Sequence, residues 1–302
     1  MNTLKKYNFN PLQKSAIMLF CIFISIMIGQ MIGGIIAANT NSEALQNIDS
    51  ITADMDYEIN LLKVLQLVYA LFSFVIPPII IALLFGDKLS SFLLLNKSPK
   101  ILYYILIPLF IFSILPAMNL IIMWNQAISL PASMSGIEEE MIRMEESGLR
   151  MTEFMLAGSG TLGFIVNMII MALIPAIGEE LMFRGLIQKH LIEWTKKPHL
   201  AIILSAIIFS AVHMQFYGFF PRLVLGALFG YLVYYSKSLW PAIFAHFFNN
   251  AMAVIAYKLG DQSLGNSEID SFGTTSSDIY FVIIGLVGAF FIGRYLFRQR
   301  LT

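Results

Sequence analysis

The sequence predicts an all-α fold, a polytopic membrane protein built as a bundle of about eight transmembrane helices with both termini cytoplasmic. Composition is the first reason for this prediction. Of the 302 residues, 58% are apolar and 13% are charged, whereas a typical soluble domain has about 25% charged residues. Mean hydropathy is +0.75. A soluble domain of this length cannot bury so large an apolar fraction, and disordered chains are poor in the aromatic residues that are abundant here.

The second reason is the length of the apolar segments. A bilayer core of about 30 Å requires about 20 mainly apolar residues in a helix. Segments of this kind cover, in chain order, residues 15–38, 64–85, 101–124, 161–187, 200–217, 219–235, 239–257 and 279–297. The first is longer than the apolar region of an ordinary signal peptide, so we expect an uncleaved first helix. No internal repeat stands out, which favours a single transmembrane domain over residues 1–302.

The distribution of lysine and arginine gives the orientation of the bundle, because cytoplasmic loops are enriched in both. With the N-terminus in the cytoplasm, 14 of the 19 Lys and Arg residues fall on the cytoplasmic side. The other side receives Lys63, Arg143, Arg150, Arg222 and Lys258. The polar stretches 39–62 and 125–153 then face outward. The second carries six glutamates, and we expect it to form a solvated helix face without chemistry.

Charge and cysteine content exclude several classes of protein. The formal net charge is zero, so no basic surface for nucleic acid is indicated. Cys21 is the single cysteine, which excludes an intramolecular disulfide framework and a cysteine-based metal cluster. We therefore expect the lipid bilayer as a partner, and no nucleic acid.

Ionisable and amide side chains gather in the fourth to seventh spans. They are Glu179, Glu180, Arg184, His213, Arg222, His246, Asn249 and Asn250. An ionisable group at the bilayer centre costs at least about 2.5–3.5 kcal/mol, and such residues indicate a functional site by default. The other spans hold almost none away from their ends.

Glu180 and Arg184 are four residues apart, so they share a helix face and predict an ion pair that holds the helix in place. Glu179 points about 100° away and lacks this partner. An unpaired buried carboxylate is costly unless a cation or a metal compensates its charge. Glu179 is therefore a candidate general base or metal ligand.

The two histidines of these spans have structural as well as functional interpretations. His213 alone could be bonded to a neighbouring helix, and His246 and Asn250, which share a helix face, could hold helices together. Glu179 and His213 are equally distant from the polar turn at residues 195–198. An antiparallel hairpin would place them at the same depth. His246 lies nine residues after the turn at Lys237, about 13 Å into the membrane at 1.5 Å per residue. The spacing predicts a shared polar cavity at mid-depth that opens to the cytoplasm.

Two versions of hydrolysis by activated water suit these side chains. In one, Glu179, His213 and His246 bind zinc or another divalent metal, whose bound water attacks a carbonyl group. In the other, Glu179 and His213 activate the water directly. His246 and the Asn250 amide then donate hydrogen bonds to the developing oxyanion. The sequence leaves both versions open.

Three motifs resemble the signature of the CPBP family of intramembrane proteases, which comprises CAAX proteases and bacteriocin-processing enzymes and is also called the Abi or Rce1-like family. They are Glu179-Glu180-x-x-x-Arg184, Phe209-x-x-x-His213 and His246-x-x-x-Asn250. They follow one another on successive predicted helices. The resemblance covers about residues 160–257, which we interpret as a CAAX-protease-like catalytic core within the single transmembrane domain.

The resemblance implies an intramembrane endopeptidase, with or without a metal, that cleaves membrane-associated, prenylated or CAAX-like, or bacteriocin-type peptide or protein substrates. It implies catalytic roles for Glu179, His213, His246 and Asn250, and supporting roles for Glu180, Arg184 and Phe209. If a metal is bound, Glu179, His213 and His246 would be its ligands. Short basic tails and the lack of extra domains favour a prokaryotic plasma membrane.

Two other function classes compete with this interpretation. A catalytically silent membrane scaffold or bacteriocin-immunity protein would keep the fold, but it could replace Glu179 and Asn250 with apolar residues and avoid the cost of burying them. A transporter would use Glu179 and the histidines as a proton relay. Inverted repeats would favour a transporter, but the proline kinks of the second and third spans have no counterpart in the second half of the chain.

Overall fold

Every regular element in the described part of the chain is a helix. The computed structural model describes residues 9–40, 55–85, 88–157, 160–260, 272–275 and 278–298. Within these residues, six helices are long and apolar enough to cross a membrane: Pro11–Asn39, Tyr57–Phe85, Ile101–Gln126, Gly160–Thr195, Phe216–Ser236 and Ile279–Leu296. This confirms the predicted class, and the chain is an integral multi-pass membrane protein with an all-α fold.

The described part of the first half of the chain contains six α-helices and two short segments of other helical type. Its α-helices are α1 (Pro11–Asn39), α2 (Asp56–Ala70), α3 (Ile76–Phe85), α4 (Leu89–Phe92), α5 (Ile101–Gln126) and α6 (Ser135–Leu156). The π-helical segment η3 (Leu71–Val75) joins α2 to α3, and the short 3-10 helix η4 (Ala132–Met134) precedes α6.

The second half begins with one long helical rod that contains two π-helical segments. The rod runs through α7 (Gly160–Asn167), η5 (Met168–Leu173), α8 (Ile174–Glu180), η6 (Leu181–Gln188) and α9 (Lys189–Thr195), of which η5 and η6 are π-helical. After it come α10 (Pro198–Ala211), the 3-10 helix η7 (Phe216–Gly218), α11 (Phe219–Ser236), α12 (Trp240–Leu259) and α14 (Ile279–Leu296).

Two of the eight expected spans, those at residues 200–217 and 239–257, are not among the six membrane-length helices. The helix in the first of them, α10, has 14 residues and ends at Ala211, so it is shorter than the expected span. α12 has 20 residues, but its histidine, two asparagines and lysine make it less apolar than the other spans. The expected number of eight spans stays a prediction. The cytoplasmic position of both termini also stays a prediction, because residues 1–8 and 299–302 lie outside the described residues.

Local sequence signals set several helix boundaries. α1 begins with a capping box, in which Asn10 and Gln13 exchange side-chain to backbone hydrogen bonds of 2.9 and 3.0 Å. Proline stands in the first turn of α10 and α12, where its missing N–H has no helical partner to lose. Lys196 and Lys237 adopt left-handed backbone angles with φ of 57° and 56°, and they end α9 and α11 at the expected polar turns.

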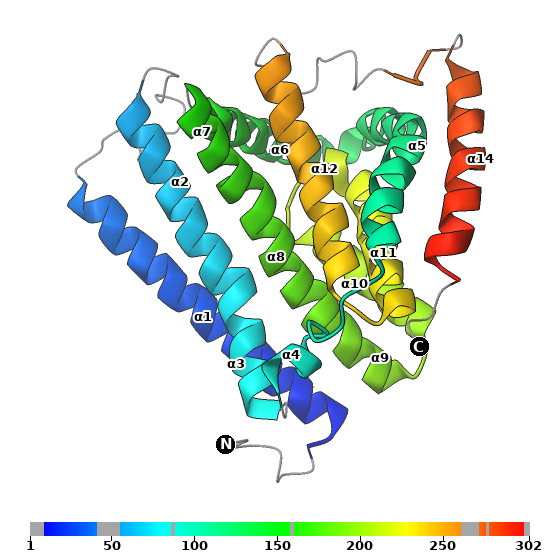
Figure 1. Cartoon of the computed structure of the whole chain (residues 1–302). Helices are drawn as coiled ribbons and strands as arrows, with labels where there is room; N and C mark the ends of the chain where they lie inside the picture. Colours follow the sequence, from blue (N-terminus) through cyan, green and yellow to red (C-terminus); the bar gives the residue numbers. More distant parts are fainter. Residues whose placement is uncertain are drawn as a thin grey trace.

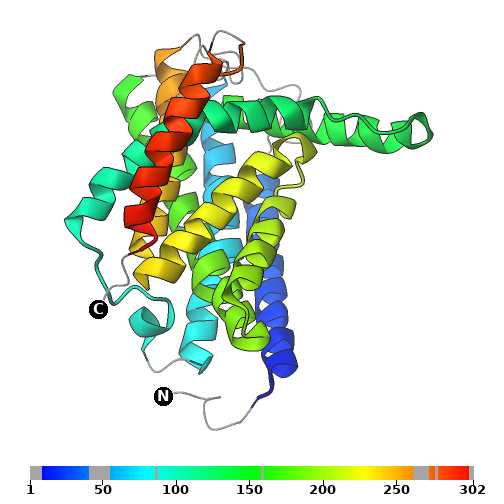
Figure 2. The same cartoon turned by 90° about the vertical axis from the view of Figure 1, so that its right-hand side faces the viewer.

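The helices form a bundle with one helix lying across it. α1, α2, α8 and α12 run side by side in Figure 1. α10 packs on α11, α5 packs on α14, and α12 packs on η5, α8 and α11. Figure 2 shows that α6 lies across the other helices near one end of the bundle and extends beyond them. The helix expected in the stretch 125–153 is therefore confirmed, and it lies at the end where α1 finishes.

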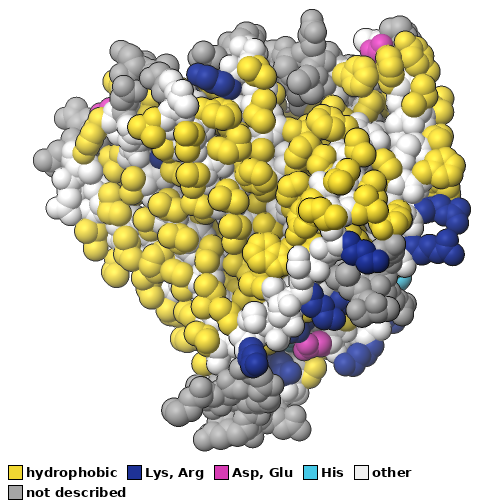
Figure 3. All heavy atoms as spheres, viewed as in Figure 1, with side chains coloured by type: hydrophobic (Ala, Val, Ile, Leu, Met, Phe, Trp, Pro, Cys, Tyr) yellow, Lys and Arg dark blue, Asp and Glu magenta, His cyan; other side chains and the backbone are white. Residues whose placement is uncertain are grey.

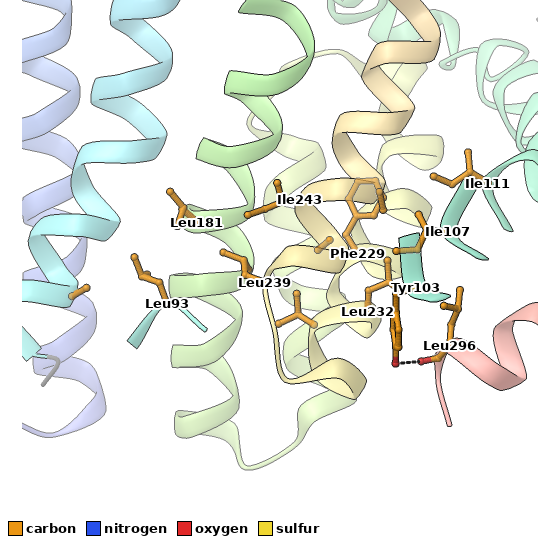
Figure 4. Packing of buried hydrophobic residues seen from close by; sticks show 14 residues of the cluster. Leu93, Tyr103, Ile107, Ile111, Leu181, Phe229, Leu232, Leu239, Ile243 and Leu296 are labelled. Carbon is orange, nitrogen blue, oxygen red and sulfur yellow. Dashed lines mark hydrogen bonds between the residues drawn. The ribbon is translucent and has the colours of Figure 1, made fainter. Parts of the chain in front are cut away.

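The surface and the interior of the bundle are both apolar. Apolar side chains cover most of the face shown in Figure 3, and lysine and arginine gather toward its lower end. Inside, Leu93, Phe229 and Leu239 belong to one buried cluster, part of which is drawn in Figure 4. In the same view Tyr103 donates a 3.1 Å hydrogen bond to the Leu296 carbonyl and so attaches α5 to α14. This cluster packs beside the buried polar groups described next.

Candidate active site

The polar motifs come from several separate elements in the second half of the chain. Glu179 and Glu180 end α8, and Arg184 follows in η6. Phe209 lies near the end of α10, whereas His246 and Asn250 lie on α12. His213 was expected on a helix, and this expectation is wrong. α10 ends at Ala211, and His213 lies in the turn before η7.

Glu180 is the centre of the buried polar cluster. Its side chain is 0% exposed, and Oε1 accepts hydrogen bonds from Arg184 at 2.6 Å and from His246 Nδ1 at 2.9 Å. The predicted ion pair with Arg184 is confirmed. The bond to His246 was not expected, and it joins α12 to the end of α8. The second oxygen, Oε2, has no hydrogen-bond partner among the described residues.

The Arg184 guanidinium contacts a carboxylate, a backbone carbonyl and two aromatic rings. One nitrogen pairs with Glu180, and another donates a 2.8 Å hydrogen bond to the Gly226 carbonyl on α11. The guanidinium carbon lies 4.6 Å from the Phe209 ring centre and 5.5 Å from that of Phe229, so both rings interact with the charge. A buried charge with this many partners is a fixed structural element of the site.

Glu179 has a different environment from its neighbour. Its side chain is 12% exposed, and Oε2 lies 3.7 Å from His246 Nε2. This distance is too long for a direct hydrogen bond. Glu179 is therefore the accessible carboxylate and Glu180 the enclosed one. His246 lies between them, with one ring nitrogen toward each.

His213 has a defined tautomer in its neutral form. Its Nδ1 lies 2.8 Å from the Phe209 carbonyl oxygen, and a carbonyl oxygen can only accept. Nδ1 therefore carries the proton, and the lone pair is on Nε2. Glu179, Arg222 and His246 all interact electrostatically with His213. The cluster thus brings Glu179 and both histidines into one region, in agreement with the predicted spacing.

Phe209 separates and orients the two histidines. Its ring centre lies 5.1 Å from that of His213 and 5.9 Å from that of His246, with nearly perpendicular planes. On its other face His246 stacks on Phe229, at 5.1 Å between ring centres. Aromatic side chains therefore fix the His246 ring, which leaves only its two nitrogens in polar contacts.

Asn250 lies one turn beyond His246 on α12. Its Oδ1 accepts a 3.4 Å hydrogen bond from Asn249 Nδ2. The structure gives it no direct bond to Glu179, Glu180 or either histidine among the described residues. The Asn250 amide is half-buried, and its Nδ2 donors are available to a bound group.

Comparison with known sequence families agrees with this geometry. Residues 161–252 match the Rce1-like family, described as type II CAAX prenyl endopeptidase Rce1-like. This stretch, which is similar to that family, is called the Rce1-like region below. No curated protein and no solved structure is significantly similar to the chain. The match begins in α7, ends in α12 and includes all the polar residues described above.

The Rce1-like region does not gather a metal-binding set in this structure. Among the described residues, no group of three or more His, Cys, Asp and Glu side chains is arranged to hold a metal ion. One nitrogen of His213 bonds to the chain itself, and His246 divides its nitrogens between two glutamates. The binding of a metal by Glu179, His213 and His246 therefore stays a prediction, and we derive no step through a metal.

The Rce1-like region also contains contacts that the motifs did not predict. Gln188 Nε2 donates a 3.1 Å hydrogen bond to the Gly230 carbonyl, one turn beyond the bond from Arg184 to Gly226. A Cβ at Gly226 would lie 3.0 Å from a ring atom of Phe209, so glycine permits the close approach. The Gly226-x-x-x-Gly230 spacing, which is typical of close membrane helix contacts, is the sequence signal for this packing.

The winding of the rod around Glu179 and Glu180 is a further unpredicted feature. α8 has only seven residues and lies between the π-helical segments η5 and η6. π-helical turns are rare and occur frequently at functional sites. They have no simple signature in a single sequence, so only the structure could reveal them.

Proposed function

We propose that this protein is an intramembrane endopeptidase of the CAAX-protease type. The observation that carries the proposal is the position of His246, with Nδ1 bonded to the enclosed Glu180 and Nε2 facing the accessible Glu179 at 3.7 Å. The Rce1-like match over residues 161–252 supports the same class of reaction. A buried polar cluster of this kind in a membrane protein is expensive to maintain without a function.

Either Glu179 or His213 acts as the general base in this proposal. The Glu179 carboxylate is accessible, and His213 has its Nε2 lone pair available because Nδ1 donates to Phe209. One of these groups takes a proton from water as the water oxygen bonds to the carbonyl carbon. The same proton then passes to the amide nitrogen as the C–N bond breaks, so the reaction consumes one water and releases a carboxylic acid and an amine, which exchange a proton to become carboxylate and ammonium.

His246 and Asn250 stabilise the oxyanion that forms on the carbonyl oxygen. His246 Nε2 donates when it carries a proton, and Asn250 offers its Nδ2 donors from the next turn of α12. Donors that are fixed before the reaction stabilise a developing charge without reorganisation. Glu180 supplies this fixation, because it holds His246 and is itself held by Arg184.

The substrate class follows from the location of the site. Substrates that reach a site within a membrane bundle have a membrane-associated part, so we propose prenylated or CAAX-like peptides or hydrophobic bacteriocin-type peptides. The metal-dependent version stays a prediction, with Glu179, His213 and His246 as the ligands that a rearranged site would use.

Metal content and cleavage measured in the same samples test the proposal. Detergent-purified wild type, Glu179→Ala and His213→Ala are assayed for zinc and other divalent metals and for hydrolysis of a prenylated CAAX peptide. Activity without stoichiometric metal, lost in both variants, supports the direct mechanism. Stoichiometric zinc that disappears with activity in both variants supports the metal version. Folded wild type that cleaves neither this peptide nor hydrophobic membrane peptides contradicts the enzyme and favours a scaffold.

A further inference from the structure

α6 extends beyond the helices that cross the membrane. Figure 2 shows that it lies nearly perpendicular to the bundle and that part of it has no bundle helix beneath it. Its C-terminal part is anchored, because Met155 is buried in a cluster with Ile59 and Leu62 of α2. Its N-terminal part follows the turn after α5, near Trp124, which is 53% exposed. Tryptophan is enriched at membrane–water interfaces.

The projecting part of α6 has two chemically different faces. At about 100° per residue, Ile137, Met141 and Met144 fall on one side of the helix. The charged side chains Glu139, Arg143, Glu146 and Arg150 fall on the opposite side. Ile137 is 53% exposed, so the described residues leave part of the apolar side uncovered.

Two glutamates near the apolar side have backbone partners. Glu138 accepts a 3.2 Å hydrogen bond from the Leu130 N–H, and Glu145 accepts a 3.2 Å hydrogen bond from the Tyr217 N–H. Both carboxylates are therefore turned toward the chain and away from the exposed apolar residues. A third glutamate, Glu140, lies about 60° from Ile137 around the helix and forms an ion pair with Arg143.

We propose that α6 is a membrane-binding helix that lies in the plane of the bilayer and rests its Ile137 face on the lipid surface. The occupant of this face is lipid because α6 lies across the bundle near the ends of the apolar membrane-length helices, and because Ile137 is on the same side of α6 as Met155, which packs on α2. A helix with one apolar and one charged face suits this interfacial position. The proposal is independent of peptidase activity.

The contacts of α6 give this position a consequence for the rest of the molecule. Glu145 binds the backbone of η7, and Gly148 packs against the Gln215 side chain, so that a Cβ there would lie 2.5 Å from Gln215 Nε2. Both contacts are on the segment that follows His213. A lipid-bound α6 would therefore hold this segment at a fixed depth relative to the bilayer.

Site-specific fluorescence in lipid nanodiscs tests the proposal on the full chain. Cys21 is the only cysteine, so Cys21→Ser provides a background for single labelled cysteines. Ile137→Cys is paired with Glu139→Cys, and Met141→Cys with Arg143→Cys, because two residues separate nearly opposite faces of a helix. Each label is quenched in turn by nitroxide lipid and by aqueous iodide.

The expected result is quenching by nitroxide lipid and a loss of iodide quenching at Ile137 and Met141, with the reverse at Glu139 and Arg143. Equal iodide quenching at all four positions would overturn the proposal, because α6 would then be solvated all round. Protection of Ile137 from both quenchers would also overturn it, since a protein partner or a second copy would cover the face. Each labelled variant is compared with the background for elution as folded protein.

Discussion

His246 donates a 2.9 Å hydrogen bond to Glu180 Oε1, the oxygen that also binds Arg184 at 2.6 Å. These residues come from α12, α8 and η6, so one carboxylate oxygen joins three elements. The arrangement gives the paired glutamates separate tasks. Glu180 orients the imidazole, and Glu179 is left facing the nitrogen that Glu180 does not use.

Removal of the Glu180 side chain should destabilise the fold as well as the site. Glu180→Ala leaves Arg184 as a buried charge without its carboxylate, and breaking a buried pair in this way costs about 3–5 kcal/mol. Glu180→Gln keeps an acceptor at Oε1 and should cost less. Thermal unfolding in detergent gives the comparison. Equal Tm values for wild type and Glu180→Ala would show that the pair does not support the bundle.

Substitution of the proposed base should slow cleavage strongly without loss of folding. Glu179→Gln keeps the shape of a partly exposed side chain, and general acid–base groups typically contribute 10²–10⁴-fold. We expect a rate loss in that range for Glu179→Gln and for His213→Ala, with Tm close to wild type. Initial rates on the prenylated CAAX peptide provide the measurement. Full activity of either variant would remove that residue from the mechanism.

Asn249 and Asn250 form a matched pair for the oxyanion assignment. We expect Asn250→Ala to lower kcat by about 10²–10³, the usual effect of losing one oxyanion donor. Asn249→Ala removes the same atoms one position away and should change kcat little. The result to look for is the difference between the two variants at similar Tm. Equal losses would indicate a shared role in packing.

Gly226→Ala should disturb the contact between α10 and α11. The added Cβ would lie 3.0 Å from Phe209 and 3.2 Å from Ala206, and overpacking of this kind costs about 1–3 kcal/mol. Gly34→Ala is the control, because a Cβ there meets nothing within 4 Å. Thermal unfolding should show a lower Tm for the first variant only. A lower Tm for both variants would show that replacing a helical glycine destabilises the protein regardless of its contacts.

Asn125 should control the order of the segment after His213. It is 0% exposed, donates a 3.1 Å hydrogen bond to the Phe216 carbonyl and accepts a 3.0 Å bond from the Phe220 N–H. Asn125→Leu removes both bonds at similar volume. We expect faster hydrogen exchange in peptides that cover residues 212–220, measured by mass spectrometry. Unchanged exchange there would mean that other contacts hold the segment.

The parts of the fold that depend on composition and periodic spacing could be predicted from the sequence. Apolar length gave the helices, and i,i+4 spacing gave the ion pair of Glu180 with Arg184. Turn residues such as Lys196 marked the ends of helices. These features are local, so neighbouring residues decide them.

The structural features that the sequence did not predict depend on contacts between segments that are distant in the chain. The bond from His246 to Glu180 spans 66 positions, and helical spacing within one span could not predict it. α10 ends before His213 because the following segment is held by Asn125 and α6. The π-helical turns around α8 likewise arise from packing. Tertiary contacts, and not local preference, decide the detailed geometry of the site.

The most direct test of the central claim is mass spectrometry of a prenylated CAAX peptide incubated with wild type and with Glu179→Gln in nanodiscs prepared in ¹⁸O-labelled water. The account predicts that wild type releases a C-terminal fragment and leaves one ¹⁸O atom in the new carboxylate, and that Glu179→Gln leaves the peptide intact. Cleavage by Glu179→Gln at the wild-type rate would contradict the account.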